Sequence, residues 1–153
     1  MANDTKNTNK HIDIFELKTS ADLFRKAETD LAQLELSNQN PHIAFNFFVT
    51  VEHLPDWLNM RSLVKKNCLL RIVSHLANGV KHFEIDEARH SSIISAEKSK
   101  YAEDGYAGDD YFEEPILVKL SPQEAKELGM SEIDAVTLGK KVVEFWRTHM
   151  PIT

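Results

Sequence analysis

The sequence contains one cysteine, Cys68, among its 153 residues. An intramolecular disulfide needs two cysteines and a cysteine-rich zinc site needs several, so both are excluded. A reducing compartment fits this composition best, and we expect a cytoplasmic location. The five glycines and five prolines exclude collagen-like and low-complexity sequence. Since 42% of the residues are hydrophobic, the chain should instead fold around one core.

Long hydrophobic runs are also absent. The most apolar stretch, residues 43–51, is too short and too interrupted to cross a bilayer. The first ten residues are polar and hold no apolar segment of signal-peptide length. We therefore expect a disordered tail over residues 1–12, a single helical-bundle domain over residues 13–153, and no membrane partner.

Positive charge is scarce, because 18 Lys and Arg face 24 Asp and Glu, for a formal net charge of -6. Such a chain has no broad attraction for phosphate backbones, although a local basic groove is compatible with it. The sequence also holds neither a glycine-rich phosphate loop nor a motif that places a catalytic cysteine or serine. We expect no cofactor.

The spacing of the apolar residues predicts a mainly α fold, a helical bundle of four to five helices. Thr19 and Asp22 resemble a capping box that begins the first helix. The second helix is expected over residues 42–59. Pro55 either kinks it or marks its end and opens a short new helix. A third helix is expected over residues 67–83.

The bundle is interrupted near residues 90–120 by a small two-stranded β-hairpin insertion. Its strands are expected at residues 91–97 and 115–120, where β-branched and aliphatic residues gather. A capping box at residues 121–124 then begins a short helix that stops near Gly129. Residues 131–134 should open the last helix.

Two polar stripes are the strongest candidates for a functional site. Both follow the spacing i, i+4, i+7 and i+11, which keeps four side chains on one face of a helix. The first stripe consists of Asn46, Thr50, His53 and Trp57, and the second of Arg71, His75, Asn78 and His82. If the helices are neighbours, the stripes line a groove, in which imidazoles could act as acid and base. Alternatively, the stripes form a buried hydrogen-bond network that fixes the helix register.

A zinc site made by His53, His75 and His82 is disfavoured. Two histidines seven residues apart on one helix lie about 10 Å apart along its axis, too far to share an ion easily. No His pair at i, i+4 and no HExxH motif occurs. We therefore expect no metal.

The segments HIAFNFFVTVEHLPDW (residues 42–57) and HLANGVKH (residues 75–82) resemble small, uncharacterised bacterial helical proteins. More distantly, they resemble the HEPN-like superfamily, many members of which are ribonucleases or nucleotide-binding proteins of toxin–antitoxin and defence systems. The family motif is an Arg and a polar residue followed further along a helix by a His. Asn78 and His82 match the polar residue and the His, whereas Ala77 stands at the Arg position.

The resemblance implies a helical bundle that forms a homodimer and binds or cleaves RNA or a nucleotide. His82 would be the acid and base, Asn78 its orienting partner, and Arg71 or Lys81 the phosphate contact. His53 and His75 would complete the groove, together with the ligand-binding side chains of Asn46, Thr50 and Trp57. The alternative is a non-catalytic module that binds a protein partner or a small ligand in the same groove. Whether the protein is an enzyme stays open at this point.

Overall fold

The computed structural model describes residues 15–81, 93–98 and 115–151, and it is mainly α-helical. Its helices are α1 (Ser20–Leu36), α2 (Pro41–Glu52), α3 (Leu54–Trp57), α4 (Ser62–Lys66), α5 (Cys68–Lys81), α6 (Pro122–Leu128) and α7 (Ala135–His149). Its strands are β1 (Ile93–Lys98), β2 (Ile116–Leu120) and β3 (Glu132–Asp134). The predicted mainly α fold with an antiparallel β-hairpin is therefore confirmed. The predicted tail over residues 1–12 lies outside the described residues.

The helices begin where the side chains predict. Thr19 and Asp22 form a complete capping box at the start of α1. Asn40 accepts from the backbone of His42 and Ile43 at the start of α2, with Pro41 as the first helical residue. α2 ends at Glu52, and Pro55 belongs to the separate short helix α3. Of the two alternatives at Pro55, the ending of the helix is therefore correct.

Two short elements differ from the sequence analysis. Residues 62–66 form α4, which was not predicted, and the side chain of Asn67 accepts from Leu70 N at 3.2 Å where α5 begins. Residues 132–134 were expected to open the last helix but form β3, which makes the sheet three-stranded. α7 starts only at Ala135, because Asp134 caps it by accepting from Thr137 N at 2.9 Å. Three residues are too few to show the alternation by which a strand is recognised.

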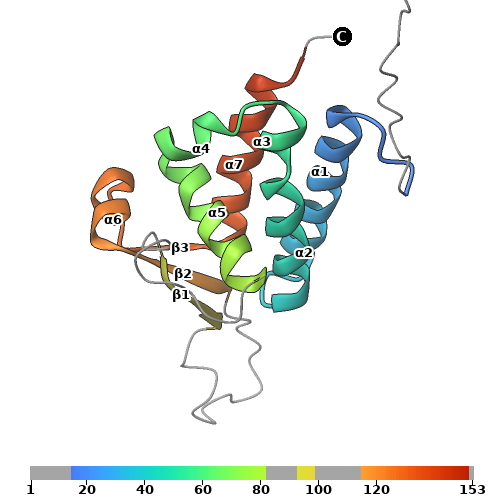
Figure 1. Ribbon diagram of the computed structural model, residues 1–153. Helices are drawn as coiled ribbons and strands as arrows, with labels where there is room; N and C mark the ends of the chain where they lie inside the picture. The colour runs from blue at the N-terminus through green and yellow to red at the C-terminus, as the bar shows by residue number, and fades with distance from the viewer. Residues whose placement is uncertain (1–14, 82–92, 99–114, 152–153) are drawn as a thin grey trace, which may run out of the picture.

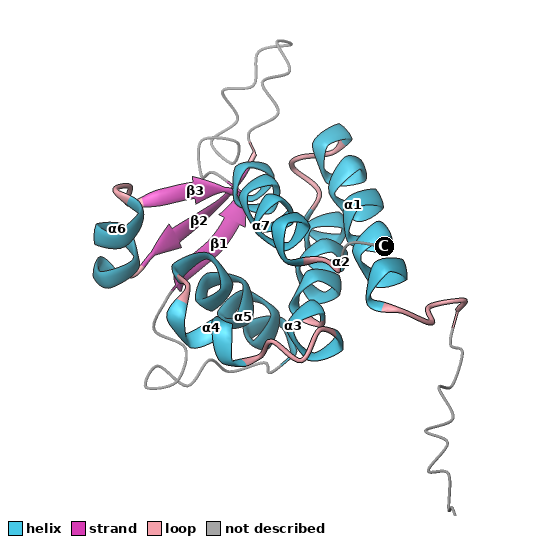
Figure 2. Cartoon of the chain, turned by 90° about the horizontal axis from the view of Figure 1, so that it is seen from above, coloured by secondary structure: helices cyan, strands magenta, loops and turns pink. Residues whose placement is uncertain are grey.

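The sheet has the order β1-β2-β3, and both pairings are antiparallel. The central strand alternates, so that Ile116, Val118 and Leu120 are buried while Lys119 is exposed. Figures 1 and 2 show the sheet at one end of the helices, with α6 beside it. β2 contacts α6 and α7, and β1 contacts α5. Residues 99–114, between β1 and β2, lie outside the described part of the chain.

Helices α1, α2, α5 and α7 form the core of the bundle (Figure 1). α2 contacts all three of the others, and its Phe47 is fully buried. Trp146 of α7 and Leu34 of α1 are fully buried as well. The apolar face of α1 packs into this core, since Leu23, Ala27, Leu31 and Leu34 are all buried.

Gly139 lets α7 approach α1 and α2 closely. A Cβ at this position would lie 2.8 Å from Leu31 Cδ1 and 2.9 Å from Phe47 Cε1. Both neighbours are buried, so neither can turn outward into solvent. Packing therefore requires a glycine at this position. In an ordinary helix, glycine is less favourable than alanine by about 1 kcal/mol.

Gly139→Ala should lower the free energy of unfolding by about 1–2 kcal/mol, because overpacking outweighs the gain in helix propensity. Urea denaturation measures the change. Lys141→Ala, an exposed substitution on the same helix, should leave the midpoint nearly unchanged. A more stable Gly139→Ala variant would contradict the close approach.

Candidate functional site

The structure does not bring all the residues of the two polar stripes together. Thr50 of the first stripe is buried toward α1, where its hydroxyl lies 2.7 Å from Asp30 Oδ2 and 3.1 Å from Lys26 Nζ. Arg71 of the second stripe faces α6. Trp57 and Asn46 are exposed, and His75 is half-buried. Lys81 is the last described residue of α5, and His82 lies outside the described residues.

One residue from each stripe does reach a common hollow between α2, α3 and α5. The hollow has a volume of about 490 Å³. His53 comes from the junction of α2 and α3, and Asn78 comes from α5. The complete lining is Phe45, Val49, Glu52, His53, Asp56, Arg61, Ser74, Ala77 and Asn78. Of the described residues of the two predicted stripes, only His53 and Asn78 line this hollow.

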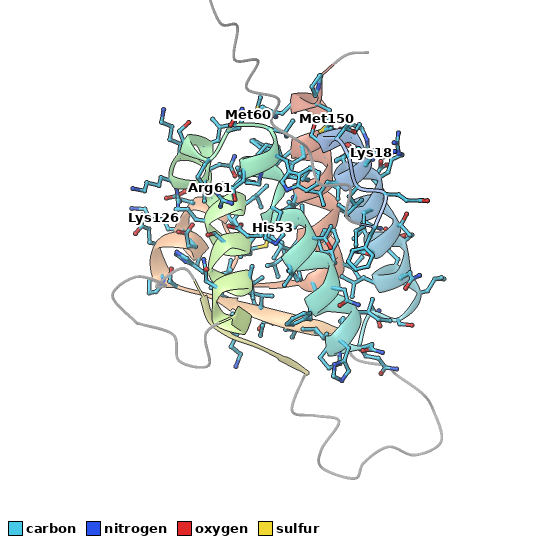
Figure 3. All side chains as sticks on the ribbon, turned by 45° about the vertical axis from the view of Figure 1, so that its right-hand side comes forward. Lys18, His53, Met60, Arg61, Lys126 and Met150 are labelled. Carbon is cyan, nitrogen blue, oxygen red and sulfur yellow. The ribbon has the colours of Figure 1, made fainter. Side chains whose placement is uncertain are left out.

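Arg61 organises the polar wall of this hollow. Its guanidinium donates to Asp56 Oδ1 at 2.8 Å and to Asp56 Oδ2 at 2.6 Å. It also pairs with the Glu52 carboxylate and donates to the Glu52 carbonyl oxygen at 3.0 Å. One side chain thereby joins the end of α2 to α3. Figure 3 labels Arg61 and His53, which line the same hollow.

The two carboxyl groups differ in their surroundings. Burial raises the pKa of Glu52 above its usual value, although hydrogen bonding and charge from Arg61 partly oppose the shift. The more exposed Asp56 has a lowered pKa, chiefly because Arg61 donates hydrogen bonds to it. Both carboxylates raise the pKa of Arg61, which stays charged. Two carboxyl groups and one guanidinium therefore line this hollow, an excess of one acidic side chain over the basic one.

Two polar groups of the hollow remain open to a ligand. The Nδ2 group of Asn78 donates to Ser74 O at 2.8 Å and lies 3.3 Å from Ser74 Oγ. Within the described part of the chain, Asn78 Oδ1 and the His53 ring make no hydrogen bond. An amide oxygen and an unprotonated ring nitrogen both accept hydrogen bonds from a ligand N–H or O–H group.

The sequence analysis missed Glu52, Asp56, Arg61 and Ser74. Glu52 and Asp56 are spaced i, i+4 on either side of Pro55, which was the available signal. Arg61 follows in a segment without apolar periodicity, so no sequence pattern predicted which helix its side chain would contact.

A second hollow of about 320 Å³ lies along the same two helices toward the sheet. Its lining is almost entirely apolar: Pro41, His42, Ala44, Phe45, Phe48, Leu76, Ala96, Ile116 and Val118. Phe45 lines both hollows and is 45% exposed, unusually high for so large an apolar side chain.

Arg71 belongs to a separate cluster that joins α5 to α6. Its Nε donates to Glu124 Oε1 at 2.9 Å, and its Nη2 lies 3.1 Å from Glu124 Oε2 and 2.7 Å from Glu127 Oε2. Its Nη1 donates to the Lys65 carbonyl oxygen at 2.8 Å. Glu124 is only 2% exposed. The guanidinium predicted to hold a phosphate thus pairs with two carboxylates of the chain itself.

Cys68 completes this cluster, with its Sγ 2.6 Å from Glu124 Oε2. The ligand atoms of Cys68, Glu124 and Glu127 lie within 4.8 Å of one another, close enough for one metal ion. Arg71 already supplies a positive charge to both carboxylates, however. Burial, together with the hydrogen bond to Glu124, raises the pKa of Cys68 to about 12, which keeps it a neutral thiol. The arrangement is that of a structural ion pair.

No protein-family model, curated protein or solved structure matches the chain. Among the described helices, none has the length and apolar character needed to cross a membrane.

Glu124→Ala should lower the free energy of unfolding by about 3 kcal/mol, because it leaves the partly buried Arg71 without its principal partner. Glu127→Ala should cost less than about 1 kcal/mol, because that carboxylate is 43% exposed. Urea denaturation of both variants compares two carboxylates that bind the same guanidinium. Equal losses would show that burial of Glu124 is unimportant.

Cys68 should react slowly with iodoacetamide at pH 8. A pKa of about 12 in place of 9.0 lowers the thiolate fraction on the order of a thousandfold. The same chain unfolded in urea is the control, since it carries the same single thiol. Glu124→Gln removes a charge that raises this pKa and should speed the reaction of the folded protein. A folded rate equal to the unfolded rate would refute this assignment.

Proposed function

We propose that the protein is a non-catalytic binding module that accepts a small ligand in the hollow between α2, α3 and α5. The observation that carries the proposal is this hollow of about 490 Å³, a size typical of small-molecule sites, together with its connected polar wall. The alternative occupant of the groove, a protein partner, is less well supported, because the polar groups converge on one hollow of small-molecule size.

The polar wall supports binding because it is already ordered. Arg61 is held by Glu52 and Asp56, and Asn78 is held by Ser74. A ligand would therefore meet groups whose side-chain entropy has already been lost on folding, which reduces the cost of binding. His53 and Asn78 Oδ1 supply hydrogen-bond acceptors to which no group in the described part of the chain donates.

Binding or cleavage of RNA, the function that the HEPN-like resemblance implies, stays a prediction. It depends on His82, which lies outside the described residues. Two features favour the binding module over it. Arg71 is paired with Glu124 and Glu127, and the hollow is lined by two carboxylates, which repel phosphate.

A screen of ¹⁵N-labelled protein against a library of small polar fragments tests the proposal. We expect some fragments to shift the amide signals of Ser74, Asn78 and His53, and His53→Ala to weaken their binding. His149→Ala, which removes a histidine from α7, is the matched control and should leave binding unchanged. Fragments that shift signals everywhere except around the hollow would contradict the proposal.

The same preparation should not cleave RNA. If it does, and if His82→Ala abolishes cleavage while circular dichroism shows that the variant is folded, the protein is an enzyme and the binding-module proposal is wrong.

A further inference from the structure

The two hollows are successive parts of one seam between α2 and α5. Phe45 lines both of them. From α5, Ser74, Ala77 and Asn78 face the polar hollow, while Leu76 faces the apolar one. A single elongated ligand could therefore occupy both hollows by lying across the Phe45 ring.

The charged side chains of the polar hollow determine whether it attracts a cation or an anion. Glu52 and Asp56 outweigh Arg61 by one negative charge, so an anion is repelled and a cation is attracted. The His53 ring and Asn78 Oδ1, which accept no hydrogen bond from residues 15–81, 93–98 or 115–151, suit a ligand group that donates N–H hydrogen bonds. An ammonium group is positive and has several such donors, so it meets both requirements.

The apolar hollow selects the rest of the ligand. Covering its aliphatic and aromatic lining, and the exposed part of Phe45, removes apolar surface from water. Phe45 and Glu52 are seven residues apart on α2, which corresponds to about 10 Å along the helix axis. A ligand that reaches from the carboxylates past Phe45 therefore needs an apolar part longer than this distance, and a short amine would fill only the polar hollow.

We infer that the ligand is an amphipathic organic cation, with its ammonium group in the polar hollow and its apolar chain across Phe45 in the second hollow. This inference rests on the proposed function, because it names the ligand class of the same site. No covalent bond is made or broken, so binding is reversible and depends on charge, hydrogen bonding and apolar area.

Isothermal titration calorimetry with four probes tests the inference, all used below their critical micelle concentrations. The probes are decylammonium, butylammonium, decanoate and decanol. Decylammonium should bind at least about tenfold more tightly than butylammonium, because the longer chain buries more apolar surface. It should also bind more tightly than decanoate, which has the same chain length but the opposite charge.

Two variants separate the two halves of the ligand. Asp56→Asn changes a half-exposed carboxylate. It should weaken the binding of decylammonium severalfold and leave the affinity for decanol unchanged. Phe45→Ala should weaken the binding of both decylammonium and decanol but leave the affinity for butylammonium unchanged. Glu144→Gln, an exposed carboxylate on α7, is the matched control and should change nothing.

The outcomes distinguish this inference from the proposed function. If polar fragments bind at His53 and Asn78 but decanoate binds as tightly as decylammonium, the inferred ligand class is wrong and the binding module stands. The same holds if chain length has no effect. If neither the four probes nor any fragment binds in the hollow, both are overturned.

Discussion

The Arg61 guanidinium holds the end of α2 and the helix α3 together at the break between them. Pro55 has no backbone N–H and cannot continue α2, so the chain must turn near Glu52. Arg61 then bridges the break by binding the Glu52 carboxylate, the Glu52 carbonyl oxygen and both oxygens of Asp56. These contacts hold the polar wall of the hollow opposite Ser74 and Asn78 of α5. The break between α2 and α3 thus creates the site, although the sequence indicates it only as a local feature at Pro55.

Arg71 acts in a similar way at the other side of α5. It pairs with Glu124 and Glu127 of α6 and with the Lys65 carbonyl oxygen of α4. The helix α6 directly follows β2, so this contact attaches the sheet to the bundle. Both arginines are therefore occupied by carboxylates of the protein itself. Neither guanidinium is available to a phosphate, and this is the physical basis on which we propose a cationic ligand.

Much of the fold follows from local sequence signals. The capping box of Thr19 and Asp22 predicted the start of α1, and the apolar spacing predicted a mainly α fold. The strand β3 and the helix α4 were missed because they are too short to show periodicity. Of the candidate site, the sequence predicted the groove and placed His53 and Asn78 in it. It could not predict that Thr50 faces α1 or that Arg71 faces α6. Periodicity groups residues on one face but does not say which helix packs there, and Arg71 and Glu124 lie 53 residues apart.

The central claim is that the hollow between α2, α3 and α5 holds a small ligand in an ordered polar site. A crystal structure of the protein with bound decylammonium tests it most directly. The account predicts the ammonium nitrogen within hydrogen-bond distance of His53, Asn78 Oδ1 or Asp56, the Arg61 contacts retained, and the alkyl chain against Phe45. An ammonium group bound at another surface, with the hollow filled by rearranged side chains of α2 and α5, would contradict the account.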